Sequence, residues 1–187
     1  MNETVHLEAN IIDILEQFNV LEEASLSNLK NSTTREFGTG RNQRSNKVNI
    51  TGVTFVPLIQ EKALLIKAKT QTIGKDDIYD THVKFVNVKY VDQPEAGTVQ
   101  IKAADGQTYN IKRLTHAQAT AKIRCTCLDF YFMFSAWNQQ KNALDGAPMP
   151  PYIKKTDRPP RNPNKIAGSC KHVTKLGDYL RFKQIIS

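Results

Sequence analysis

The sequence predicts an α+β fold with an N-terminal helix, an antiparallel β-sheet and a C-terminal hairpin–helix unit organised by a metal ion. Three observations indicate this class. Apolar residues recur at helical steps near the start, β-branched and aromatic residues dominate the middle, and all three cysteines fall in one pattern, Cys125-x-Cys127 with Cys170-x-His172. At 187 residues and 40% apolar content, the chain is long enough to bury a core.

Residues 1–30 form the first expected unit, an acidic amphipathic helix. Between Val5 and Ala24 the apolar positions follow three- and four-residue steps, at Leu7, Ile11, Ile14, Leu15, Phe18 and Leu21. Six acidic residues stand against Lys30 alone, which gives this unit a net charge of −5 and leaves +13 on the rest. The helix either docks on the core of its own chain or is an arm for a neighbouring subunit.

Residues 31–50 are polar and contain Gly38 and Gly40, so we expect a basic linker that cannot order itself. Its cations Arg35, Arg41 and Arg44 are candidate contacts to phosphate or to acidic protein. The basic charge of the body has a second interpretation, a surface that is merely well solvated.

Residues 51–97 are expected to be β-rich, with strands over 53–59, 63–69 and 82–91. Pro57 has no N–H to donate, so it places the first of these at a sheet edge. Two further strands, 99–102 and 109–112, flank Asp105-Gly106, a pair typical of a tight β-hairpin turn.

The cysteine pattern predicts a metal site with Cys125, Cys127, Cys170 and His172 as ligands. Three thiolates and an imidazole form a closed, soft set that suits one structural Zn²⁺ and leaves no position for water; iron remains an alternative. Two other interpretations are open. The cysteines are simply buried and free, or Cys125 and Cys127 form a disulfide, which would be strained and would leave one thiol over.

The segments Arg124-Cys-Thr-Cys-Leu-Asp-Phe130 and Ser169-Cys-Lys-His-Val173 together resemble the SWIM-type zinc finger, over about residues 98–183. The resemblance implies that the Cys-x-Cys pair ends a β-hairpin and that the Cys-x-His pair opens a helix packed against it. We therefore define residues 98–187 as a SWIM-like unit. Its insertion, residues 128–169, is longer than the family pattern.

The insertion begins with a predicted helix, Leu128–Leu144, whose Phe130, Phe134 and Trp137 share one face. Six of the eight prolines follow in residues 148–163, so this loop is stiff and extended. A stiff loop would present its basic residues to a partner; the other interpretation is a loop that is only solvated. These residues are Lys154, Lys155, Arg158 and Arg161. The run Lys155–Pro163 resembles little-characterised structural proteins of large tailed bacteriophages.

No serine–histidine–aspartate order, paired carboxylates or glycine-rich nucleotide motif is present, and an enzyme is the least supported class. We expect a non-enzymatic structural or adaptor protein that binds other subunits, made in the host cytoplasm and then built into a phage virion. The alternative is a nucleic-acid-binding protein using the finger and the basic loop. Neither a membrane span, a cleaved leader nor a small-molecule substrate is expected.

Overall fold

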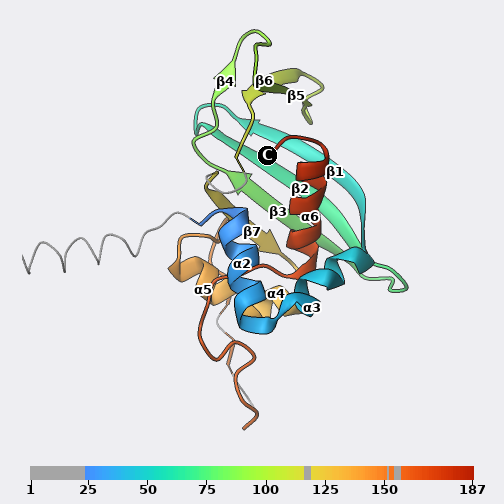
Figure 1. The fold of residues 1–187 in the computed structure, drawn as a ribbon, viewed down its shortest axis with the longest axis vertical. Helices are drawn as coiled ribbons and strands as arrows, with labels where there is room; N and C mark the ends of the chain where they lie inside the picture. Colours follow the sequence, from blue (N-terminus) through green and yellow to red (C-terminus); the bar gives the residue numbers. More distant parts are fainter. Residues whose placement is uncertain (1–23, 116–118, 151, 154–156) are drawn as a thin grey trace, which may run out of the picture.

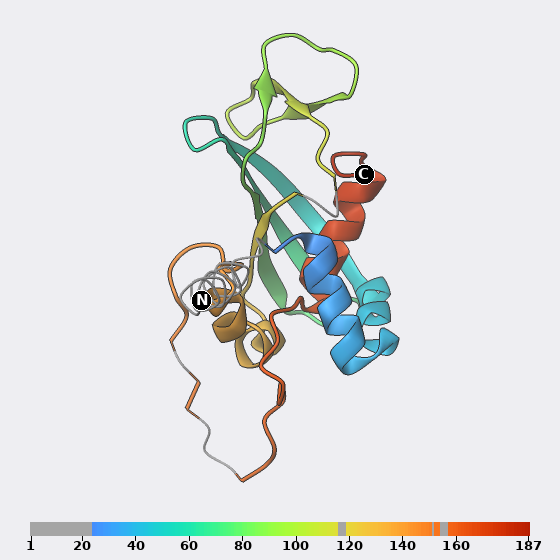
Figure 2. The same cartoon turned by 60° about the vertical axis from the view of Figure 1, so that its left-hand side comes forward.

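The computed structural model describes residues 24–115, 119–150, 152–153 and 157–187. Helices and antiparallel sheets make up an α+β fold, as predicted. The small sheet lies at one end of the molecule and α4 and α5 at the other, with the large sheet between them (Figures 1 and 2). The predicted helix over residues 5–24 falls outside the described residues except for Ala24.

The large sheet has four antiparallel strands in the order β1-β2-β3-β7. They are β1 Val48–Leu58, β2 Ala63–Thr72, β3 Ile78–Phe85 and β7 Ala121–Cys125. Side chains alternate between its two faces, and one face buries Leu64, Ile66, Val83, Phe85 and Ile123. Pro57 lies in β1, an edge strand, which confirms that prediction.

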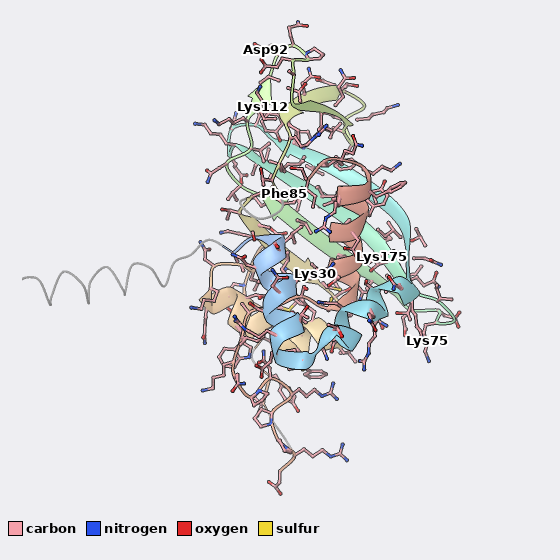
Figure 3. The ribbon with its side chains drawn as sticks, in the orientation of Figure 1. Lys30, Lys75, Phe85, Asp92, Lys112 and Lys175 are labelled. Atoms are coloured by element: carbon pink, nitrogen blue, oxygen red, sulfur yellow. The ribbon has the colours of Figure 1, made fainter. Side chains whose placement is uncertain are left out.

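Helices cover this buried face. The C-terminal helix α6, Lys171–Phe182, contacts all four strands, and α2, Leu26–Phe37, lies next to it. Figure 3 shows Lys30 on α2 and Lys175 on α6 on the same side of the sheet. An ion pair of 2.9 Å between Lys30 Nζ and Asp178 Oδ1 links the two helices.

The prediction of an unstructured linker at residues 31–50 is wrong. This stretch completes α2, forms α3 Thr39–Gln43 and the 3₁₀ turn η1 Arg44–Lys47, and starts β1. Ser25 caps α2 by accepting from the Asn28 N–H at 3.0 Å. Composition misled because polar side chains bond inside the fold here: buried Thr33 donates to the Leu29 carbonyl and accepts from the Ser169 N–H.

A separate three-stranded sheet, in the order β4-β6-β5, contains the predicted hairpin. Its strands are β4 Tyr90–Val91, β5 Thr98–Lys102 and β6 Thr108–Lys112. Gly106 in the turn has φ of 83°, which glycine adopts readily. The predicted strand 82–91 is instead divided between two sheets, because β3 ends at Phe85 and Asn87 turns the chain with φ of 59°.

The SWIM resemblance implied that Cys125 and Cys127 end the β5–β6 hairpin, and this prediction is wrong. Cys125 ends β7, which pairs with β3 of the large sheet. The stretches 51–97 and 98–187, expected as two units, therefore contribute strands to the same sheet. Nothing in residues 98–112 reveals this, because the pairing of β7 joins segments far apart in the chain.

The insertion begins with two short helices, α4 Leu128–Met133 and α5 Ser135–Gln140, in place of one continuous helix. Phe134 lies between the two helices, and its φ of −127° interrupts the helical backbone. Residues 143–145 then hydrogen-bond to the backbone of Ile123 and extend the sheet beyond β7. Pairing with an exposed strand edge thus replaces the last turn of the predicted helix.

The backbone at Gly168 packs too closely against its neighbours to leave room for a side chain. A Cβ there would lie 2.5 Å from Thr33 Oγ1 and 2.7 Å from Phe134 Cε1. Gly168→Ala should lower the free energy of unfolding by roughly 1–3 kcal/mol, because buried overpacking strains its neighbours. The control is Gly52→Ala, whose Cβ would meet nothing within 4 Å. Equal urea unfolding midpoints for the two variants would contradict this packing.

Candidate metal centre

The four predicted ligands come from three elements that meet at the end of the large sheet. Cys125 is the last residue of β7, and Cys127 is the N-cap of α4. Cys170 is the N-cap of α6, and His172 lies in its first turn. Ser169 precedes this cap, and its hydroxyl lies 3.1 Å from that of Thr174.

The ligand atoms of these residues all lie within 4.8 Å of one another. His172 Nδ1 is 3.8 Å from Cys125 Sγ and 4.0 Å from Cys170 Sγ. Zn–S and Zn–N bonds of about 2.3 and 2.0 Å in a tetrahedron put ligand atoms roughly 3.5–3.8 Å apart. Small adjustments would close the site on one ion, so the cluster is close enough to coordinate a metal.

The cluster is isolated from solvent. Cys125 and Cys170 are 0% exposed, His172 2% and Cys127 3%. All three cysteines are free, so the structure shows no Cys125–Cys127 disulfide. Three thiols and an imidazole packed together form a soft donor set that suits zinc or iron, and the residues present fit such an ion.

Hydrogen bonds inside the cluster favour the thiolate at Cys125 and the neutral thiol at Cys170. Burial raises the pKa of Cys125, but hydrogen bonds from Cys127, Cys170 and the Thr81 hydroxyl bring that pKa well below its usual range. The pKa of Cys170 is raised well above its usual range, first by burial and then by its hydrogen bonds to the other two thiols. The Phe130 N–H also donates to Cys127 Sγ at 3.3 Å. Thiol protons are therefore held within the cluster, where a metal would replace them.

His172 is oriented for coordination through Nδ1. Its Nε2 lies 3.3 Å from Thr72 Oγ1, at the end of β2, and the Tyr79 ring packs 4.7 Å from its centre. When Nε2 carries the proton and donates to Thr72, the lone pair of Nδ1 points at the sulfurs.

The chain approaching Cys170 is fixed by buried amide side chains. Asn138 donates to the Gly168 carbonyl at 3.0 Å and accepts from the Gly168 N–H at 2.9 Å. Asn162 donates to the carbonyls of Met133 and Ile166 and accepts from the Ile166 N–H. The insertion is therefore held against α4 and α5 just before it supplies the third thiol.

The expected partner-binding residues that the structure describes come from α2, α3, η1 and the proline-rich loop. Arg35 and Arg44 are exposed on α2 and η1, and Arg158 and Arg161 are exposed on the proline-rich loop. Arg161 lies 5.5 Å from the centre of the Phe132 ring. Lys154 and Lys155 lie outside the described residues.

Arg41, also expected to meet a partner, makes contacts within its own chain. Its side chain is 17% exposed and pairs with Asp129 at 2.5 Å. The guanidinium also packs over the rings of Phe37 and Phe134, at 5.0 and 5.4 Å. Arg41 thereby ties α3 to α4, a long-range contact that local composition does not reveal.

His82 and Asp145, 63 positions apart in the sequence, lie together in the fold, with His82 Nδ1 3.5 Å from Asp145 Oδ2. No sequence signal could have joined them, because their contact depends on the pairing of β3 with β7. Arg124 precedes Cys125 in β7, so it points to the opposite face of the sheet, where it bonds the carbonyls of Asp145 and Ala147.

None of the helices in the described part of the chain has the length and apolarity of a membrane span. No protein-family model, curated protein or solved structure compared with the chain matches it. The resemblances to SWIM-type fingers and to phage proteins therefore remain predictions.

His172→Ala should abolish metal binding and lower the free energy of unfolding by more than about 3 kcal/mol. The reason is that the site exists only in the folded chain, so metal binding stabilises the folded state. Elemental analysis and urea unfolding measure the two effects. His82→Gln, which changes a histidine on the opposite face of the same sheet, should keep the metal. Full metal content in His172→Ala would show that this imidazole is not a ligand.

Thr72→Val should leave the metal bound but weaken its affinity about 10- to 100-fold, because the Nε2 hydrogen bond that orients His172 is lost. Competition with a chelator measures the affinity. Thr54→Val, on an exposed position of β1, is the matched control. Identical affinities for the two variants would remove Thr72 from this role.

Proposed function

We propose that this chain is a zinc-stabilised, non-enzymatic structural or adaptor protein, and that it belongs to a tailed-phage particle after synthesis in the host cytoplasm. The buried, closed Cys₃His cluster carries the proposal. A catalytic zinc needs an open position for water or substrate, whereas four protein ligands fill a tetrahedral zinc. The donor set therefore favours a role in holding the fold. The phage context is supported by the sequence resemblance alone.

The position of the cluster supports the same role. One ion would join the end of β7, the start of α4 and the start of α6. These elements hold the insertion against the large sheet and so determine the position of the surfaces of the insertion. A rigid frame of this kind suits a subunit that presents surfaces to other proteins.

An aromatic groove supports protein binding. It is a hollow of about 560 Å³ between α4, α5 and the proline-rich loop, and its lining includes Tyr131, Phe132, Trp137, Tyr152, Arg158 and Arg161. The rings of Phe132 and Tyr152 lie 4.7 Å apart, and Tyr152 is 53% exposed. Aromatic and arginine side chains are enriched at protein interfaces.

We assign residues 1–23 of a neighbouring copy to this groove. The sequence of that segment predicts a helix with an apolar stripe, and it contains six acidic residues and no lysine or arginine. The stripe suits the aromatic lining, and the acids complement Arg158 and Arg161. Exchange of this segment between copies would build an assembly from one kind of chain.

Deleting residues 1–23 should abolish self-association while leaving one metal per chain, because all four proposed ligands lie outside this segment. Light scattering after size exclusion, at low and high salt, measures the oligomeric state. Tyr152→Ala should weaken association in the full-length chain, whereas Phe182→Ala, which removes an exposed ring elsewhere, should not.

Normal association of the truncated chain would contradict the proposal. If the full-length chain instead bound duplex DNA with a log–log salt slope near about −5, as for roughly six phosphate contacts, nucleic-acid binding would take its place.

A further inference from the structure

The face of the large sheet opposite α6 carries a second hollow, which the proposed function does not use. Its volume is about 670 Å³, and strands β2, β3 and β7 line it together with residues 145–150. We call it the strand-face hollow and define it by Leu65, Lys67, His82, Arg124, Tyr131, Asp145 and Met149. It is separate from both the metal centre and the aromatic groove, apart from the shared borders at Tyr131, Met149 and Pro150.

Three basic side chains form a row across the floor of the hollow. Lys67 pairs with His82 across β2 and β3, and His82 pairs with Arg124 across β3 and β7. Side chains of directly opposed residues start about 4.5–5.5 Å apart on the same face. The long side chains of Lys67 and Arg124 therefore flank the shorter His82 and can reach one group above its ring.

Two side chains of this row, Lys67 and Arg124, lack the carboxylate partner that neighbouring lysines of the sheet have. Lys69 pairs with Asp80 and Lys84 with Glu61, both at 2.6 Å. Among the described residues, neither Lys67 nor Arg124 forms an ion pair with a carboxylate. Two lysines of the same sheet face are thus occupied, whereas the two cations of the hollow are free to meet an anion.

The remaining groups fix the row. Arg124 Nε donates to the Asp145 carbonyl at 2.5 Å, and Nη2 donates to the Ala147 carbonyl. These bonds hold the guanidinium and leave its other N–H groups for a ligand. Asp145, the carboxylate of the hollow, is turned to His82 Nδ1, so Nε2 is the histidine nitrogen left for a ligand.

We propose that the strand-face hollow binds the phosphate group of a phosphorylated ligand. Lys67, His82 and Arg124 approach from three adjacent strands, which matches an anion with three or more oxygens better than a two-oxygen carboxylate. Tyr131, Leu65 and Met149 offer an aromatic and apolar border for the organic part next to the phosphate. The ligand is a free phosphate ester or a phosphate of a nucleic-acid strand.

The test uses the full-length, metal-loaded chain and three probes: inorganic phosphate, adenosine monophosphate and a short single-stranded oligonucleotide. Calorimetry should show that at least one organic probe binds more tightly than inorganic phosphate. Lys67→Gln should weaken that binding about tenfold, the loss of one charge-assisted contact. Lys69→Gln is the matched control, since it removes the same charge from the same face two residues along β2.

Tighter binding of the oligonucleotide than of the mononucleotide would identify a nucleic-acid strand as the source, and equal binding a free phosphate ester. Equal weakening by Lys67→Gln and Lys69→Gln would show only general attraction to a basic protein and would overturn the proposal. Absence of binding by all three probes at millimolar concentration would overturn it as well. Metal content and self-association should be the same in both variants, so this result is independent of the proposed function.

Discussion

Three thiols and an imidazole are buried together where the large sheet, α4 and α6 meet. Such polar groups are costly to bury unless each has a partner, and a shared metal ion gives all four the same one. The ligands come from a strand end and two helix starts, so satisfying them fixes how the sheet, α4 and α6 meet. The N-terminal end of α6 also favours the negative charge of a thiolate-rich site.

The long insertion is compatible with this constraint because it is anchored at both sides of its free loop. Residues 143–145 extend the sheet beside β7, and Asn138 and Asn162 hold the chain before Cys170 through buried hydrogen bonds. The described residues of the loop between these anchors contribute no member of the cluster. The aromatic groove lies where this loop meets α4 and α5.

Local patterns in the sequence predicted local features well. The repeated one-residue spacing predicted which four residues meet in the buried cluster, Asp105-Gly106 predicted a hairpin, and Pro57 predicted an edge strand. The features that the sequence did not predict depend on contacts between distant segments. Thr33 and Arg41 order a polar stretch through bonds to Ser169 and Asp129, and the His82–Asp145 pair exists only because β3 lies beside β7. Composition and periodicity carry no information about such pairings.

X-ray absorption at the zinc edge of the purified chain tests whether these four residues hold the metal, because it counts ligands and measures their distances. We expect one zinc per chain with three sulfurs at about 2.3 Å and one nitrogen at about 2.0–2.1 Å. An oxygen ligand in place of a sulfur, or metal well below one equivalent, would contradict a closed structural site.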